Sequence, residues 1–82
     1  MNKRDVIRHY DLYTYLAIYE DVRFRDDTIY KVFSFRAATP KTAEEVAMVH
    51  ALDFQEIIDG YRVVNLILQS VNHERKSEPM FI

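Results

Sequence analysis

Gly60, the only glycine of this 82-residue chain, lies inside its longest apolar pattern. A chain with one glycine has few sites for tight turns that need a positive φ, so a few long elements are favoured over many short strands. Around Gly60, apolar residues recur at alternating spacings of four and three, which is the heptad pattern of a packed helix. The pattern comprises Ala43, Ala47, His50, Phe54, Ile57, Tyr61, Val64, Leu68 and Val71, with His50 as its only polar member.

This pattern predicts one long C-terminal helix, continuous or bent at Gly60. The helix is expected to begin at residues 40–43, because Thr42 and Glu45 form a capping box two residues after Pro40. The alternative is that Gly60 ends the helix in a left-handed conformation and that residues 61–70 form a third strand. We favour the helix because the heptad phase continues through the glycine, which costs only about 1 kcal/mol relative to alanine.

Two segments before this helix have strand character. Residues 10–24 carry apolar side chains at most even positions, and residues 29–36 are rich in β-branched and aromatic side chains. The polar residues between them predict a hairpin with Asp26 and Asp27 as its two loop residues. In this register the numbers of paired residues sum to 53, and one face of the hairpin, which includes Leu16 and Ile18, is mostly apolar.

The start of the chain supports two interpretations. Residues 3–19 also fit a helical spacing, but we expect a short helix or an irregular segment up to about residue 9, followed by the first strand. The sequence thus predicts a single α+β domain over residues 1–82, an antiparallel β-hairpin followed by a long C-terminal helix. Residues 73–82 are expected to form a flexible tail, because they are mostly polar.

The composition excludes several classes of protein. Without cysteine there are no disulfides, cysteine-based zinc sites or iron–sulfur clusters. The balance of 11 basic and 13 acidic residues gives no strong field toward nucleic acid or an anionic membrane. No apolar run reaches the ~18 to 20 residues of a membrane span or the length of a signal peptide. We therefore expect a cytoplasmic protein with no membrane partner.

The apolar surface of the predicted helix points to a homodimer. Between residues 61 and 71 apolar side chains point in nearly every direction, and a two-stranded hairpin can cover only one side. A second chain would supply the missing cover; the alternative is a helix formed by residues 3–19 of the same chain. The expected dimer interface comprises Ile57, Tyr61, Val64, Ile67, Leu68 and Val71.

No residue pattern indicates catalysis, a metal site or a cofactor. His50 and Asp53 share one helical turn, but no His-x-x-x-His or comparable set of ligands accompanies them. Neighbouring carboxylates, such as Asp26 and Asp27, lie in a predicted turn rather than in a shielded cleft. With one glycine there is also no phosphate-binding loop. We expect a protein that is not an enzyme and binds no cofactor.

Tyrosine and arginine, which protein interfaces favour, are concentrated in the predicted hairpin. If residues 10–24 form a strand, both of its faces are apolar or aromatic, and this surplus needs a partner or an intramolecular cover. The expected partner-binding residues are Tyr13, Tyr15, Tyr19, Arg23, Tyr30 and Arg36. They predict a protein-binding regulator or inhibitor, a format that phages and mobile elements also use. The alternative is a nucleic-acid-binding regulator using the same arginines and tyrosines, which the net charge of −2 disfavours.

Overall fold

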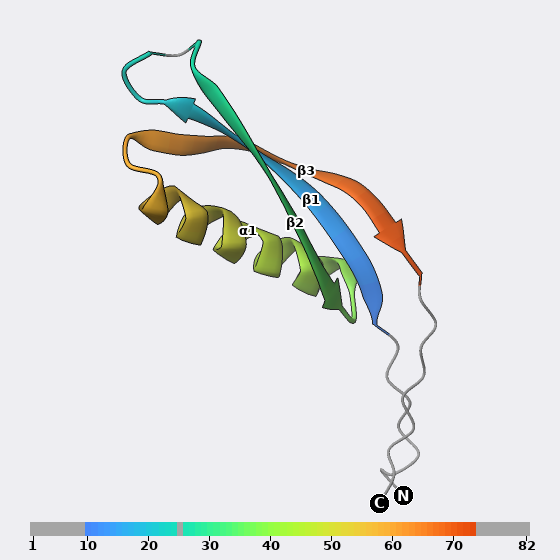
Figure 1. Cartoon of the computed structure of the whole chain (residues 1–82). Helices are drawn as coiled ribbons and strands as arrows, with labels where there is room; N and C mark the ends of the chain where they lie inside the picture. The colour runs from blue at the N-terminus through green and yellow to red at the C-terminus, as the bar shows by residue number, and fades with distance from the viewer. Residues whose placement is uncertain (1–9, 25, 74–82) are drawn as a thin grey trace, which may run out of the picture.

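The chain forms three strands and one helix in the computed structural model, which describes residues 10–24 and 26–73 (Figure 1). The elements are β1 (Asp11–Asp21), β2 (Thr28–Ala37), α1 (Pro40–Ile57) and β3 (Tyr61–Asn72). The expected N-terminal segment, up to residue 9, lies outside the described residues, and so does the expected tail from residue 74 onward. His73 is described, and its Nδ1 lies 3.1 Å from Asp11 Oδ2.

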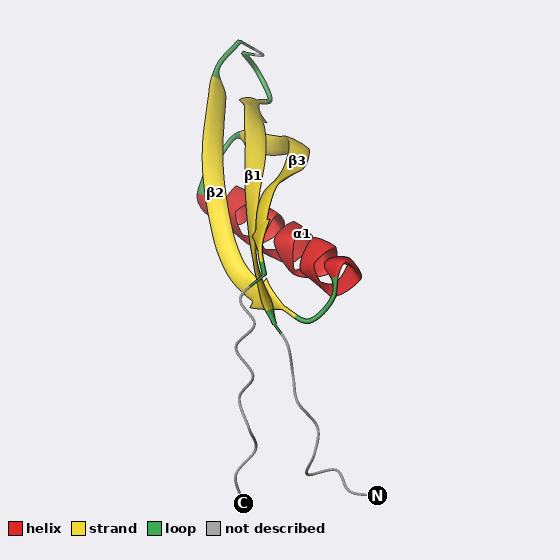
Figure 2. Ribbon diagram, turned by 90° about the vertical axis from the view of Figure 1, so that its right-hand side faces the viewer, coloured by secondary structure: helices red, strands yellow, loops and turns green. Residues whose placement is uncertain are grey.

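The three strands form one antiparallel sheet in the order β2-β1-β3, with α1 packed on one of its faces (Figures 1 and 2). The prediction of a hairpin followed by a long C-terminal helix is therefore wrong. The helix lies between β2 and β3 in the chain, and the residues expected to continue it form the third strand. None of the helices in the described part of the chain is long and apolar enough to span a membrane.

The turn at Gly60 separates the helix from the third strand. The helix ends at Ile57; Ile58 is extended, and its N–H donates to the carbonyl of Phe54. Gly60 has a φ of +89°, the left-handed region that the alternative interpretation required. The heptad phase continued through the glycine in the sequence, but the backbone reverses there.

The start of the helix agrees with the expected range, although its cap differs. Thr39 is the N-cap and Pro40 takes the first helical turn, where a missing N–H costs nothing. Thr39 Oγ1 accepts a hydrogen bond from the N–H of Thr42 at 3.1 Å. The predicted capping box is wrong because Thr42 already lies inside the helix.

The pairing of β1 with β2 differs from the predicted register. The numbers of paired residues sum to 48, as in Leu16 opposite Val32. The connection is longer than two residues because hydrogen bonds close it as a loop: Asp21 N–H donates to the Asp27 carbonyl, and Asp27 N–H donates to that of Phe24, both at 3.0 Å. The shift is by an odd number of residues, so it changes which side chains of β2 share a face with those of β1.

The core lies between the odd-numbered side chains of β1 and a stripe of alanines on α1. Ala43, Ala47 and Ala51 follow one another at spacings of four residues and are fully buried. Their small side chains let the helix approach β1 closely, and tyrosines of β1 fill the remaining space. Tyr19 is fully buried, and its hydroxyl donates to the Ala51 carbonyl at 2.8 Å. Burial raises the pKa of Tyr19, which keeps this donor protonated.

We expect Gly60→Ala to lower the free energy of unfolding by about 1–2 kcal/mol, because a residue with a Cβ is strained in the left-handed region. Lack of room is not the cause, since the nearest atom to a Cβ built there is Arg23 Nη2 at 4.0 Å. Gly60→Asn should lose less stability than Gly60→Ala, because asparagine tolerates this region better. Urea unfolding followed by circular dichroism measures the difference. Equal stability of all three proteins would contradict the role of φ.

We expect Ala47→Leu to lower the free energy of unfolding by about 1–3 kcal/mol, because the larger side chain forces α1 away from β1. Val49→Leu is the control on the same helix, since the Val49 side chain is 56% exposed and should tolerate the extra methylene. Thermal unfolding of the two variants compares them directly. An Ala47→Leu protein as stable as wild type would show that the alanine stripe does not set the distance between helix and sheet.

Candidate interaction surfaces

The face of the sheet opposite α1 is apolar at its centre, and we call it the open face. Side chains alternate between the faces of a strand, so the even-numbered residues of β1 point away from the helix that buries the odd-numbered ones. The apolar members of the open face are Leu12, Leu16, Ile18, Tyr30, Val32 and Ile67. No element of the described chain covers this face, and Tyr30 and Val32 are 62% and 57% exposed (Figure 2).

The pairing of the strands arranges the open face in rows. The central row consists of Leu16 with its neighbours Val32 and Ile67. On the side of the β1–β2 loop lies a row with two large side chains, formed by Ile18, Tyr30 and Asn65. On the other side lies a row of small side chains, formed by Thr14, Ser34 and Ser70. Charged residues of β1 and β2 on this face occur only at its two ends, Glu20 and Arg36.

Two hydrogen bonds within the sheet engage polar side chains of the open face. Thr14 Oγ1 and Ser34 Oγ lie 3.0 Å apart in a hydroxyl pair. Asn65 Oδ1 accepts a hydrogen bond from the Leu66 N–H at 2.9 Å. Burying a polar group is costly mainly when it loses its hydrogen bond. Water can therefore leave the centre of this face without leaving these oxygens unpaired.

A second surface is the groove between α1 and β3, with a volume of about 510 Å³. Its apolar walls include Met48, Val64 and Leu68, which are 43%, 46% and 46% exposed. Glu44 and Tyr15 also line it. Burial, assisted by the nearby charge of Glu44, raises the pKa of Tyr15, so the groove holds a neutral hydroxyl beside one carboxylate.

The β3 edge of the sheet, beside this groove, has features that oppose the addition of a further strand. Gln55 of α1 accepts a hydrogen bond from the Val63 N–H at 2.8 Å, and Asn65 occupies that of Leu66. Two irregularities in the pairing of β1 with β3, between Thr14 and Tyr15 and between Ile18 and Tyr19, also break the regular edge. Capped donors and bulges are features that oppose edge-to-edge pairing. The groove therefore does not continue into a free edge for a further strand.

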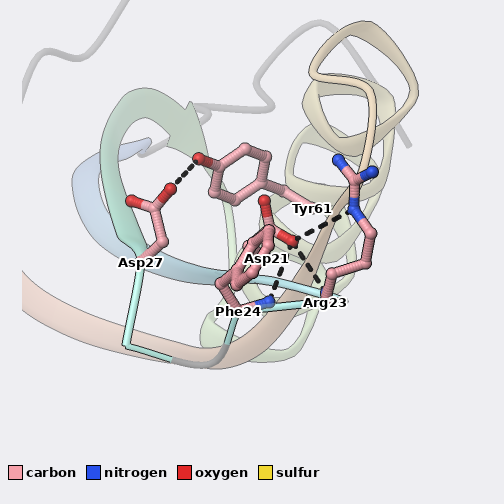
Figure 3. Close-up of polar contacts among 5 residues, drawn as sticks. All are labelled: Asp21, Arg23, Phe24, Asp27 and Tyr61. Carbon is pink, nitrogen blue, oxygen red and sulfur yellow. Dashed lines mark hydrogen bonds and ion pairs between the residues drawn. The ribbon is translucent and has the colours of Figure 1, made fainter.

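A cluster of polar contacts holds the loop between β1 and β2 (Figure 3). Asp21 Oδ1 accepts hydrogen bonds from the backbone N–H groups of Arg23 at 2.7 Å and of Phe24 at 3.2 Å. The N–H of Arg23 is the main reason that the pKa of Asp21 is lowered, and that of Phe24 adds to it. The Tyr61 hydroxyl donates to Asp27 Oδ2 at 2.8 Å, which joins this loop to β3.

The expected partner-binding residues do not form one surface. Tyr13, Tyr15 and Tyr19 lie in the core beneath α1, with at most 7% of each residue exposed. Arg23 lies in the β1–β2 loop, while Tyr30 and Arg36 lie on the open face. The strand has two apolar faces, and the helix covers the one that carries the tyrosines.

The expected dimer interface is also divided among several places. Tyr61 and Val71 pack against the core, and Ile57 is 75% exposed at the end of α1. Val64 and Leu68 line the groove, whereas Ile67 belongs to the open face. Sequence reasoning placed Leu16 and Ile18 on an apolar hairpin face but did not assign them to a site. The apolar character of both faces of β1 is the sequence feature that could have identified Leu16 and Ile18 as members of a site.

His50 is a packing residue at the margin of the helix. Its ring stacks on Phe33 at 5.7 Å between centroids and lies 5.5 Å from that of Phe35. Asp53, three residues later, does not complete a metal site with it. The described residues contain no group of three or more side chains able to hold a metal ion.

We expect Asp21→Asn to lower the free energy of unfolding at pH 7. The free energy of unfolding of this variant should also fall less between pH 7 and pH 2.5 than that of the wild type. Asp21 has a lower pKa in the folded chain than its ordinary value of 3.8. The ionised carboxylate therefore contributes fully to the free energy of unfolding at pH values above 3.8. The contribution is lost as the pH falls through the lower folded pKa. Urea unfolding at pH 7, 4 and 2.5 measures this, with Asp26→Asn in the same exposed loop as the control. A steeper acid dependence in the Asp21 variant than in wild type would contradict the assignment.

Comparisons with known proteins add no relative to this description. No protein-family model, no curated protein and no solved structure matches the chain. The features that bear on function are therefore those of the chain itself, namely the open face, the groove and the loop cluster.

Proposed function

We propose that this chain is a cytoplasmic, non-enzymatic protein-binding module that regulates or inhibits another macromolecule, and that the open face is its protein interface. One observation carries the proposal. The central strand has two apolar faces, and the described chain covers only the one beneath α1. The absence of cysteine is compatible with a reducing compartment.

The size of the open face supports a protein partner. Three strands about 4.8 Å apart, with about nine residues of β1 rising roughly 3.3 Å each, span on the order of 400 Å². Apolar side chains occupy six of the fifteen positions in the five rows of this face. Covering them would contribute roughly 4 kcal/mol before the costs of association are subtracted. The hydrogen bond between the Thr14 and Ser34 hydroxyls lowers the cost of removing water from these two side chains.

The chemistry of this face favours protein over nucleic acid. Its central row is aliphatic, and the charges on β1 and β2 lie at its ends. Nucleic-acid surfaces combine basic side chains that follow the phosphates with exposed aromatic rings that stack on bases. Tyr13, Tyr15 and Tyr19 would have supplied such rings, but they are buried.

A matched pair of substitutions tests the proposal. Val32 on the open face and Val49 on the outer side of α1 are 57% and 56% exposed, so glutamate should disturb folding equally little at either position. We expect the wild-type chain and Val49→Glu to retain a protein in stoichiometric amount from an extract of the cells that make it. Val32→Glu should retain less than about a tenth of that amount, because a carboxylate would be buried unpaired.

Three outcomes would count against this function. Retention by Val32→Glu equal to that of wild type would remove the open face as the interface. Equal loss in both variants would show a general effect of charge. A partner that nuclease treatment removes would replace protein binding by nucleic-acid binding.

A further inference from the structure

We propose that the protein that covers the open face is a second copy of this chain, packed face to face about a two-fold axis. The axis lies between the two sheets, perpendicular to the strands, and crosses the central row of Leu16, Val32 and Ile67. This inference rests on the proposed function of the open face as a protein interface, and it names the partner. It concerns a different surface from the dimer interface expected from the sequence, because only Ile67 is common to both.

The rows of the open face are complementary to themselves under this rotation. A two-fold axis through the central row exchanges the two sides of that row, so the Ile18 and Tyr30 row of one copy lies on the Thr14 and Ser34 row of the other. Large side chains then meet small ones at two equivalent places. Such self-complementarity is what a two-fold interface requires, because each copy contributes the same patch.

The direction of the axis follows from the same rows. An axis parallel to the strands would place each row on its own counterpart, so that Ile18 meets Ile18 and the carboxylate of Glu20 faces another Glu20. The perpendicular axis instead places the row of Glu20, Thr28 and Arg62 over the row of Leu12, Arg36 and Asn72, so that no carboxylate faces its own counterpart. Two aligned sheets pack about 10 Å apart and rotated by roughly 30°, which the pleated open face allows.

The area suits a reversible dimer. Two open faces together cover on the order of 800 Å² in projection, and standing side chains raise the accessible area that is buried toward about 1,000 Å² or more. Specific interfaces begin near this size. The Thr14 and Ser34 hydroxyls already share one hydrogen bond at 3.0 Å, so one of their two hydroxyl protons needs no acceptor from the second copy. We expect a dissociation constant in the micromolar range.

Sedimentation of the purified chain between about 1 and 100 μM tests whether the dimer forms, a range that spans a micromolar dissociation constant. We expect the mass to rise from 9.8 kDa toward twice that value. Val49→Glu should behave as wild type, and Val32→Glu should stay monomeric. A wild-type chain that remains a 9.8 kDa species at the highest concentration would overturn the inference.

A size exchange on β2 tests the arrangement itself. Tyr30 and Ser34 are both exposed in a single chain and lie over one another's row across the axis. Ser34→Tyr alone places tyrosine on tyrosine, and Tyr30→Ser alone leaves a hollow, so each should weaken the dimer about tenfold or more. The double variant exchanges the large and small rows and should return to within about threefold of wild type. Circular dichroism confirms that each variant is folded.

The outcomes separate the inference from the proposed function. Additive losses in the double variant would overturn the two-fold arrangement even if a dimer forms. A second result is a purified chain that stays monomeric while the wild type, but not Val32→Glu, retains a different protein from the extract. That result would overturn the second copy as the partner and leave the open face as an interface. A monomeric chain whose retention of other proteins does not change in Val32→Glu would contradict both the second copy as partner and the open face as interface.

Discussion

The close contact between the alanine stripe of α1 and the tyrosines of β1 determines the rest of the structure. Three alanines at spacings of four leave one side of the helix with only small side chains. Large side chains of the sheet are needed to fill the space opposite them. The bond from the Tyr19 hydroxyl to the Ala51 carbonyl links the two elements inside this contact. Because the helix packs on the tyrosine side of the sheet, the aliphatic side is left uncovered by the described chain.

The local features of the sequence predicted much of the fold. The strand character of residues 10–24 and 29–36 corresponds to β1 and β2, and the helix begins within the expected range. The register could not be predicted, because hydrogen bonds made by Asp21 and Asp27 close a loop without a turn signature in its sequence. Pairing by apolar side chains alone favoured a shorter turn, since both faces of β1 are apolar.

The third strand was mistaken for a helix because its pairing is irregular. The residues of β3 opposite the buried side of β1 are Tyr61, Val63, Leu66, Leu68 and Val71. Their spacings of two and three come from the two irregularities in pairing, and they hide the period of two by which strands are identified. Gly60 decided between the two interpretations through its backbone conformation, which its identity alone does not fix. The tyrosines were misplaced for a related reason, because residues that favour interfaces also fill the space opposite alanines.

The capped edge of β3 also bears on how large an assembly of this chain can become. A sheet with one apolar face and accessible edges can grow sideways by adding strand after strand, which leads to fibres rather than defined complexes. Gln55 and Asn65 occupy two backbone donors that such growth would use, and Gln55 does so from the helix. These caps oppose growth of the sheet at the β3 edge. In the proposed face-to-face dimer the second copy would occupy the open face, and the assembly would stop at two chains.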